Sequence, residues 1–412
     1  MNVGENAPVD EDLLEDPQQA PLPPARHSGS GTGATGALAA GQLVRRLRTL
    51  GVPLAAAAGS ALLSCLMLLW LKTPGETLVG RFHVWDAQFY VQIAQQGYPS
   101  GYQYTGSGQL AGSNLAFFPL YPLLIRITYS LTGIAPATAA LVVAWVCAAV
   151  AAIVVHRLVS RLYSTRVAGF AVALVFCQPM AVSLWLAYTE SLFLALAAGA
   201  LLAMRKESWV WAGVLTCAAG LTRSTGLAVA AALVVAVVLA VRRERRLGWR
   251  AAAGCAIGCL GTPAYLVWVG LRVGQWNGWS RIQSAGWGTA WDWGSSTFDF
   301  LTSTLHNSDG WVPVSVAFVL LGYLLSTVVA LLRRPWPPLA VYGVLIVVVS
   351  LGQSNYYHSK PRLLVPILLA LLPLAAALAR SRRSSAYLAL GGLAFFGTWF
   401  GAYMLTIWPY AI

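Results

Sequence analysis

Charged side chains are scarce in this chain of 412 residues, where only 10% of the residues are Asp, Glu, Lys or Arg. Hydrophobic residues make up 58% and the mean hydropathy is +0.65, more than a water-soluble core requires. This composition excludes an ordinary soluble domain and predicts an all-α polytopic membrane protein. The net charge of +13 does not indicate nucleic acid as a partner, because the basic residues form short clusters between apolar segments.

Patterns typical of a metal centre are also lacking. No cysteine stands at zinc-site spacing to a histidine, and we find no carboxylate pair or metal triad. We therefore expect no metal, no cofactor and buried free thiols. All the cysteines fall inside apolar segments: Cys65, Cys147, Cys177, Cys217, Cys255 and Cys259.

The N-terminal segment has little that could build a core. Residues 1–44 are rich in Pro, Gly, Ser and Ala and begin with acidic residues, so we expect a disordered cytoplasmic tail and no cleavable signal. A basic cluster, Arg45, Arg46 and Arg48, comes directly before the first apolar segment. Residues 45–412 then form one membrane-embedded domain in this interpretation.

Apolar segments predict about eleven membrane crossings. They cover residues 51–71, 136–156, 167–186, 188–204, 209–222, 225–241, 251–272, 311–332, 339–352, 361–379 and 386–408. Two external loops, 72–135 and 273–310, interrupt them. Residues 115–131 hold two prolines and Arg126, which favours a helix in the membrane interface over a crossing. The spans that flank Arg223 are short, at about 14 to 17 residues, as is typical around a water-filled cavity.

The distribution of basic residues supports this count. Eighteen would lie on the cytoplasmic side, in the clusters at 45–48, 157–166, 205–206, 242–250, 333–334 and 380–383. Eight would lie outside: Lys72, Arg81, Arg126, Arg223, Arg272, Arg281, Lys360 and Arg362. A crossing at 115–131 would reverse every later loop and break this positive-inside pattern.

The first external loop contains an amphipathic stretch that begins near Asp86. Trp85, Phe89 and Ile93 recur at a spacing of four and share one helical face, which predicts a short helix on the membrane surface. Asp86 would lie at the start of this helix and face water or a cavity. Its carboxylate is either a cap for the free amides of the first turn or a catalytic group.

Cationic side chains gather in a later external segment. His358, Lys360 and Arg362 lie within five positions at the start of a span, a cluster typical of anion binding. Snorkelling to the interface is the alternative for Lys360 and Arg362. That alternative explains the cluster less well, because basic residues are otherwise sparse on this side. A phosphate at the membrane surface is the expected partner.

Two further features left alternatives open. Glu190 lies between apolar spans and either forms a structural ion pair with Arg223 or contacts substrate. The loop 273–310 is rich in tryptophan, which indicates an aromatic belt at the membrane interface or a platform on which sugars or lipids stack.

Four short motifs resemble one known family. They are Trp85-Asp86-Ala87 with Ile93-Ala94 and Gly97-Tyr98, then Ala116-Phe117-Phe118-Pro119, Tyr188-Thr189-Glu190-Ser191-Leu192-Phe193 and Arg223-Ser224-Thr225-Gly226-Leu227. In this order and spacing they resemble the PIG-V group of membrane mannosyltransferases within the GT-C superfamily, which includes the eukaryotic GPI mannosyltransferase II.

The resemblance implies a GT-C catalytic domain that transfers mannose, with inversion, from a polyprenyl-phosphate-mannose donor to a lipid-linked glycan acceptor. The active site would lie on the extracytoplasmic face, and the Ala-, Val- and Arg-heavy composition suggests a bacterial cytoplasmic membrane. The family places a catalytic carboxylate in the first external loop, and Asp86 is the matching residue. Trp85, Gln88, Tyr90 and Glu190 are the expected substrate-binding or orienting residues.

Elementary chemistry supports the same roles. An inverting transfer needs a base on the acceptor hydroxyl, for which Asp86 is the candidate. The phosphate leaving group needs no acid, but it needs cations, and we expect His358 and Lys360 as primary and Arg223 and Arg362 as secondary contacts. Two alternatives remain at this level, a protein O-mannosyltransferase with the same donor and a lipid or glycan transporter. A transporter is expected to have charges or helix breaks in the middle of spans at corresponding positions of its two halves. The sequence shows neither feature.

Overall fold

The computed structural model describes residues 32–411 and divides the chain into two units, 1–48 and 49–412. The first helix, α1 (Thr32–Leu71), begins before the boundary between the units. Residues 32–44 were expected to belong to a disordered tail and lie in this helix. The rest of the expected tail, 1–31, lies outside the described residues.

Six helical segments in the described chain are long and apolar enough to cross a membrane alone. They are Leu50–Leu71 of α1, α5 (Pro136–Leu162), α9 (Gly226–Glu244), α10 (Trp249–Val273), α13 (Trp311–Leu332) and α17 (Arg383–Thr406). A seventh is the segment Tyr357–Leu363 together with α16 (Leu368–Arg380), which meet at a bend of 68°.

The other expected crossings correspond to shorter helices. These are α6 (Thr165–Cys177), α7 (Glu190–Arg205), α8 (Trp209–Gly220) and α14 (Pro337–Leu351). The expected span 167–186 was too long, because α6 ends at Cys177 and a 3₁₀ turn, η2 (Ala181–Leu184), follows. Of the two spans that flank Arg223, α8 is short as expected, whereas α9 has 19 residues and is longer than expected.

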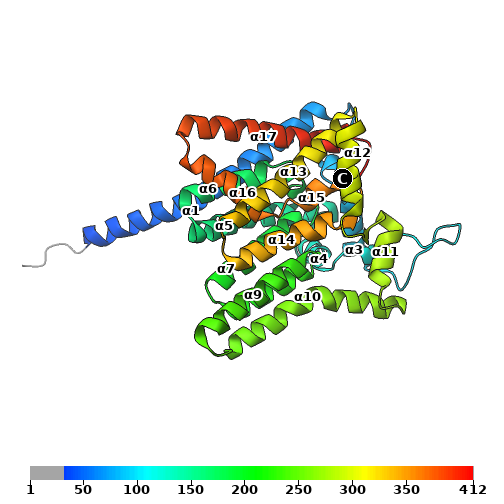
Figure 1. Cartoon of the computed structure of the whole chain (residues 1–412), viewed down its shortest axis with the longest axis horizontal. Helices are drawn as coiled ribbons and strands as arrows, with labels where there is room; N and C mark the ends of the chain where they lie inside the picture. Colours follow the sequence, from blue (N-terminus) through cyan, green and yellow to red (C-terminus); the bar gives the residue numbers. More distant parts are fainter. Residues whose placement is uncertain (1–31, 412) are drawn as a thin grey trace, which may run out of the picture. The chain divides into compact units, whose positions relative to one another are not determined.

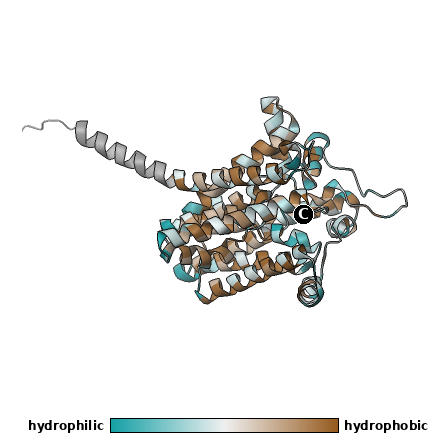
Figure 2. Cartoon of the chain, turned by 90° about the horizontal axis from the view of Figure 1, so that it is seen from above, coloured by the Kyte–Doolittle hydropathy of each residue, from teal (hydrophilic) through white to brown (hydrophobic). Residues whose placement is uncertain are grey.

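The basic loops meet at one end of these helices. The Arg166 side chain donates to the carbonyl of Ser381, Arg243 pairs with Glu207 at 2.8 Å, and the Arg205 guanidinium lies 5.8 Å from the centre of the Trp336 ring. These contacts link five loops in two groups, and the charge pattern predicted that these loops share one side. Figure 2 shows hydrophobic residues along the helices and hydrophilic residues concentrated at their two ends.

Short elements gather at the opposite end, which lies at the right of Figure 1. The first external loop forms α2 (Leu78–Arg81), α3 (Asp86–Gln96), the 3₁₀ turn η1 (Asn114–Ala116) and α4 (Leu120–Thr132). The second forms α11 (Gly278–Trp287), β1 (Ala290–Trp291) and α12 (Ser295–Asn307). After α14 come β2 (Gln353–Ser354), η3 (Tyr357–Ser359) and α15 (Lys360–Leu363), and β2 pairs antiparallel with β1.

Glycines allow α8 and α10 to approach backbone to backbone. A Cβ at Gly213 would lie 2.2 Å from the Gly254 carbonyl oxygen, and one at Gly261 would lie 2.2 Å from that of Cys217. Small residues at such crossings are typical of membrane helices, in which close packing stabilises association. This contact holds the end of α8, and therefore the turn that carries Arg223, against α10.

We predict that Gly213→Ala lowers the free energy of unfolding by about 1–3 kcal/mol, the usual cost of inserting a carbon into a packed contact. Gly322→Ala is the matched control, because a Cβ at Gly322 of α13 meets nothing within 4 Å. Thermal unfolding of both purified variants in detergent measures the difference. A Gly213→Ala variant as stable as Gly322→Ala would contradict the packing described.

Candidate active site

Asp86 is the first residue of α3, and the backbone before it is strained. Trp85 has φ 56° and ψ −115°, a conformation that costs a residue with a side chain about 1–3 kcal/mol. Asp86 follows this strained residue directly, and its side chain lines a pocket. Among the described residues its carboxylate pairs with Arg362 at 2.9 Å, so it is more than a helix cap.

Glu190 begins α7, next to the same carboxylate. Its side chain is only 2% exposed, and its Oε1 lies 2.7 Å from Nη1 of Arg223 and 3.5 Å from Nε of Arg362. Arg223 also donates to Thr189 Oγ1 at 3.1 Å, and the Tyr90 hydroxyl lies 3.5 Å from the same oxygen. Glu190 therefore bridges the two arginines, and the ion pair suggested by the sequence is present.

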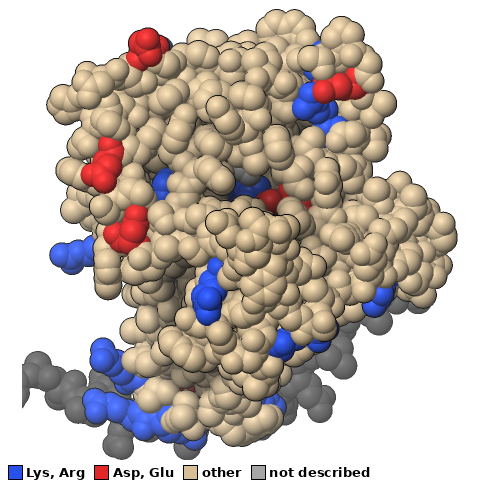
Figure 3. All heavy atoms as spheres, turned by 90° about the vertical axis from the view of Figure 1, so that its right-hand side faces the viewer, with Lys and Arg blue, Asp and Glu red and all other residues tan. Residues whose placement is uncertain are grey.

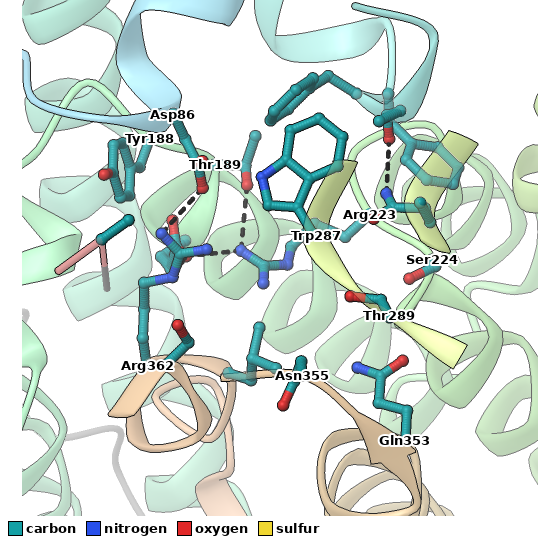
Figure 4. Close-up of a pocket in the computed structure, with 18 of the residues that line it drawn as sticks. Asp86, Tyr188, Thr189, Arg223, Ser224, Trp287, Thr289, Gln353, Asn355 and Arg362 are labelled. Atoms are coloured by element: carbon teal, nitrogen blue, oxygen red, sulfur yellow. Dashed lines mark hydrogen bonds and ion pairs between the residues drawn. The ribbon is translucent and has the colours of Figure 1, made fainter. Parts of the chain in front are cut away.

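These four charged residues, which we call the charged cluster, come from four separate parts of the chain (Figure 4). Asp86 comes from the first external loop, Glu190 from the start of α7, Arg223 from the α8–α9 turn and Arg362 from α15. Two carboxylates and two guanidiniums give the cluster no formal net charge. Arg362 is 12% exposed and its guanidinium carbon lies 5.0 Å from the centre of the Tyr188 ring, which also fixes it by a cation–π contact.

The charged cluster forms one side of a pocket whose other sides are aromatic and polar. Aromatic residues of the first external loop, Phe117 and Phe118, line it, and Trp287 at the end of α11 packs edge-on against Phe117. Uncharged polar side chains complete it: Ser224, Gln283, Thr289, Gln353, Asn355 and Ser359. Figure 3 looks onto this end of the protein and shows acidic and basic atoms at the bottom of a hollow.

Two glycines bring the two external loops together beside this pocket. A Cβ at Gly112 would lie 2.6 Å from the Gly286 Cα, so neither position has room for a side chain. Their contact places the end of α11, and with it Trp287, over the loop that carries Phe117.

The predicted site residues divide into two groups. Asp86, Tyr90, Glu190, Arg223 and Arg362 all line the pocket. Trp85 and Gln88 are exposed and lie outside its lining, because the helical turn points them away from Asp86.

His358 and Lys360, the expected primary phosphate contacts, are also absent from the lining. The His358 ring is buried among Tyr356, Tyr357, Trp408 and Tyr410. The ammonium group of Lys360 donates a hydrogen bond to the Gln353 carbonyl at 2.8 Å, so it is engaged by the protein backbone.

Several lining residues had no assigned role in the sequence. Thr189 lies inside a motif that we noted, but its contact with Arg223 could not be anticipated. Trp287 belongs to the tryptophan-rich loop, for which an aromatic belt and a stacking platform were both open. Asn355 lies within the cationic segment and was not singled out. An uncharged side chain such as that of Asn355 forms no sequence pattern of its own, so it does not stand out beside the charged residues of the same segment.

Metal-binding chemistry has no candidate among the described residues, where no group of three or more His, Cys, Asp or Glu side chains is placed to hold an ion. The six cysteines are free. Cys177 is buried and the other five are partly exposed, which corrects the expectation that all six thiols are buried.

One known family matches the part of the chain that carries most of the charged cluster. Residues 61–242 match the model of the family described as Mannosyltransferase (PIG-V). This range covers less than half of the chain. Three members of the charged cluster, Asp86, Glu190 and Arg223, lie inside the matched range, and Arg362 lies beyond it. No curated protein matches the chain.

Solved structures support the fold. ArnT from Cupriavidus metallidurans, bound to undecaprenyl phosphate, is similar with a TM-score of 0.51 and 16% identity, over 83% of this chain and 62% of ArnT. Its apo form gives 0.51 and 18%, over 87% and 63%. The oligosaccharyltransferase AglB from Archaeoglobus fulgidus gives 0.47 and 13%, over 87% and 56%. The chain thus spans less than two thirds of these proteins. The likeness to ArnT shows that the chain shares the fold of that protein.

We predict that Arg223→Gln lowers the free energy of unfolding by about 3 kcal/mol, the lower end of the range for breaking a buried ion pair. In this variant Glu190 would still keep its longer contact to Arg362. Because the carboxylate keeps one partner, we expect a loss of stability at the lower end of the range. Arg246→Gln, an exposed change at the other end of the helices, is the control. Thermal unfolding compares the two, and equal midpoints would mean that the pair adds nothing to stability.

Proposed function

We propose that this chain is an inverting mannosyltransferase that takes mannose from polyprenyl-phosphate-mannose and transfers it to a lipid-linked glycan on the extracytoplasmic face. The observation that carries the proposal is the charged cluster, which combines an accessible carboxylate with two arginines in one pocket. The match of residues 61–242 to the PIG-V mannosyltransferase model supports mannose as the transferred sugar. ArnT, which shares the fold, was solved with undecaprenyl phosphate, and this supports a polyprenyl phosphate carrier.

The two carboxylates differ in a way that selects the base. Glu190 is 2% exposed and its Oε1 is shared by both arginines, whereas the Asp86 side chain is 18% exposed and has one partner. A general base must come within hydrogen-bond reach of the acceptor hydroxyl, so we assign this role to Asp86. Glu190 orients the arginines.

The two arginines are suited to the leaving group. A guanidinium presents its donors in a planar fork that matches phosphate oxygens, and both side chains border the pocket. Arg223 and Arg362 therefore replace His358 and Lys360 as the proposed contacts of the donor phosphate. The cluster has no net charge, so a bound phosphodiester would draw Arg362 from Asp86 and leave that carboxylate free to accept a proton.

The reaction then balances without an acid. The acceptor oxygen attacks C1 of mannose from the face opposite the phosphate, and its proton passes to Asp86. The bond between C1 and the phosphate oxygen breaks, and the electron pair stays on the polyprenyl phosphate. Arg223 and Arg362 stabilise the charge that develops there. One displacement inverts the configuration at C1.

The end of the protein that carries the pocket is opposite the end at which the basic loops meet. Under the positive-inside rule the basic end faces the cytoplasm and the pocket faces outward. The N-terminus would then be cytoplasmic. A bacterial cytoplasmic membrane, in which polyprenyl phosphate carriers present sugars on the outer face, fits this arrangement.

We predict that Asp86→Asn lowers the rate of mannose transfer about 10²- to 10⁴-fold, the usual contribution of a general base. Purified protein, undecaprenyl-phosphate-[³H]mannose and membrane lipids from a deletion strain form the assay. The control is Asp299→Asn, an exposed change on α12 at the same end of the protein. Transfer at the wild-type rate by Asp86→Asn would exclude the role, and label appearing in protein instead of lipid would identify a protein O-mannosyltransferase.

The proposed orientation has its own test. Alkaline phosphatase, which is active only outside the cytoplasm, should be active when fused after Asn307 and inactive when fused after Arg246. The first position ends α12 near the pocket, and the second lies in the basic loop between α9 and α10. The opposite pattern of activity would place the pocket in the cytoplasm.

A further inference from the structure

The pocket has a second wall that the charged cluster does not explain. The two strands β1 and β2 form a short antiparallel ribbon in which Ala290 is opposite Ser354 and Trp291 is opposite Gln353. Continuing this register places Thr289 opposite Asn355. Side chains alternate between the faces of a strand, so Thr289, Gln353 and Asn355 belong to one face, and all three line the pocket.

The opposite face of the ribbon is fixed to the protein. The Ser354 hydroxyl accepts from the Ala290 amide and donates to the Gly288 carbonyl, which ties the two strands together. Lys360 donates to the Gln353 carbonyl at 2.8 Å, and the Asp292 amide donates to the Gly352 carbonyl. The ribbon is therefore a rigid support, and Lys360 is one of the groups that position it.

The chemistry of this face is uncharged and polar. Amide and hydroxyl groups donate and accept hydrogen bonds without adding charge, which suits a ligand with many hydroxyls. Asn355 supplies a direct indication, because its Oδ1 is buried and has no hydrogen-bond partner among the described residues. A buried polar oxygen of this kind normally has a partner, so a ligand hydroxyl would satisfy it.

Trp287 adds an apolar surface beside the ribbon. It ends α11 two residues before Thr289, lines the pocket, and is held by edge-on contacts with Phe89 and Phe117. A sugar ring has polar edges and an apolar face of C–H groups. A fixed indole next to amide and hydroxyl groups matches both surfaces.

We infer that the face formed by Thr289, Gln353 and Asn355, with Trp287, is a hexose subsite that recognises the sugar of the donor, while Arg223 and Arg362 bind its phosphate. This inference rests on the proposed function, because it assigns the sugar to the wall that borders the proposed phosphate site (Figure 4). It separates two contributions to donor binding. One depends on the phosphate alone, and the other depends on the hydroxyls of the ring.

Binding of two lipids to the purified full-length chain in nanodiscs tests the inference. The probes are undecaprenyl phosphate and undecaprenyl-phosphate-mannose, and the measured quantity is the ratio of their dissociation constants. The wild type should bind the mannosylated lipid more tightly. Asn355→Ala should weaken binding of the mannosylated lipid about 3- to 10-fold, the size expected for one hydrogen bond to a hydroxyl, and leave the bare lipid phosphate unchanged.

Two further variants keep the result decisive. Thr289→Val removes only a hydroxyl from the same face and should show the same selective loss if Asn355→Ala folds poorly. Asn307→Ala makes the same chemical change at an exposed position at the end of α12 and should alter neither constant. Equal binding of the two lipids by the wild type, or an equal loss for both in Asn355→Ala and Thr289→Val, would overturn the hexose subsite.

The proposed phosphate site is tested separately in the same experiment. Arg362→Gln should weaken both lipids by a similar factor, because it removes a phosphate contact that they share. If Arg362→Gln binds both lipids as the wild type does, the phosphate assignment fails. The response of Asn355→Ala to the sugar still decides the subsite on its own.

Discussion

The arrangement of the site depends on the buried attraction between two carboxylates and two guanidiniums. Each of the four side chains alone would carry a desolvation cost, because none is more than 18% exposed. Within the cluster, the attraction between opposite charges offsets these desolvation costs. The attraction requires α3, α7, α15 and the α8–α9 turn to meet at one point. The interaction therefore fixes the relative positions of elements up to 276 residues apart, between Asp86 and Arg362. Substrate binding can use the same charges because they are already assembled.

Much of the fold could be predicted from the sequence because membrane helices have a simple requirement. Apolar runs define the helices, and the basic clusters define which loops share an end, so the alternation of the helices followed from those two features alone. Helix length was less predictable. The sequence 167–186 is mostly apolar, yet the helix ends at Cys177, because Pro179 disfavours the helical conformation at Gln178 before it. Hydropathy carries no information about such a break.

The site was partly predictable for a related reason. Asp86 stands at the start of an amphipathic helix and within a motif that resembles a known family, so its place at the helix start and beside the pocket could be predicted. The sequence did not show which of His358, Lys360 and Arg362 would face the pocket. Residues two apart on a helix lie about 200° apart around its axis, so Lys360 and Arg362 at the start of α15 point in nearly opposite directions. Which of them faces the pocket depends on how α15 packs, and its four residues have no periodicity that would reveal it.

The shortness of α8 has a consequence for the surrounding bilayer. Twelve helical residues rise about 18 Å, well below the hydrocarbon thickness of about 30 Å. The helix also exposes large apolar side chains, Trp211 and Val214, on its outer surface. Lipids beside it would have to thin to match it, which draws their headgroups inward on one flank of the protein.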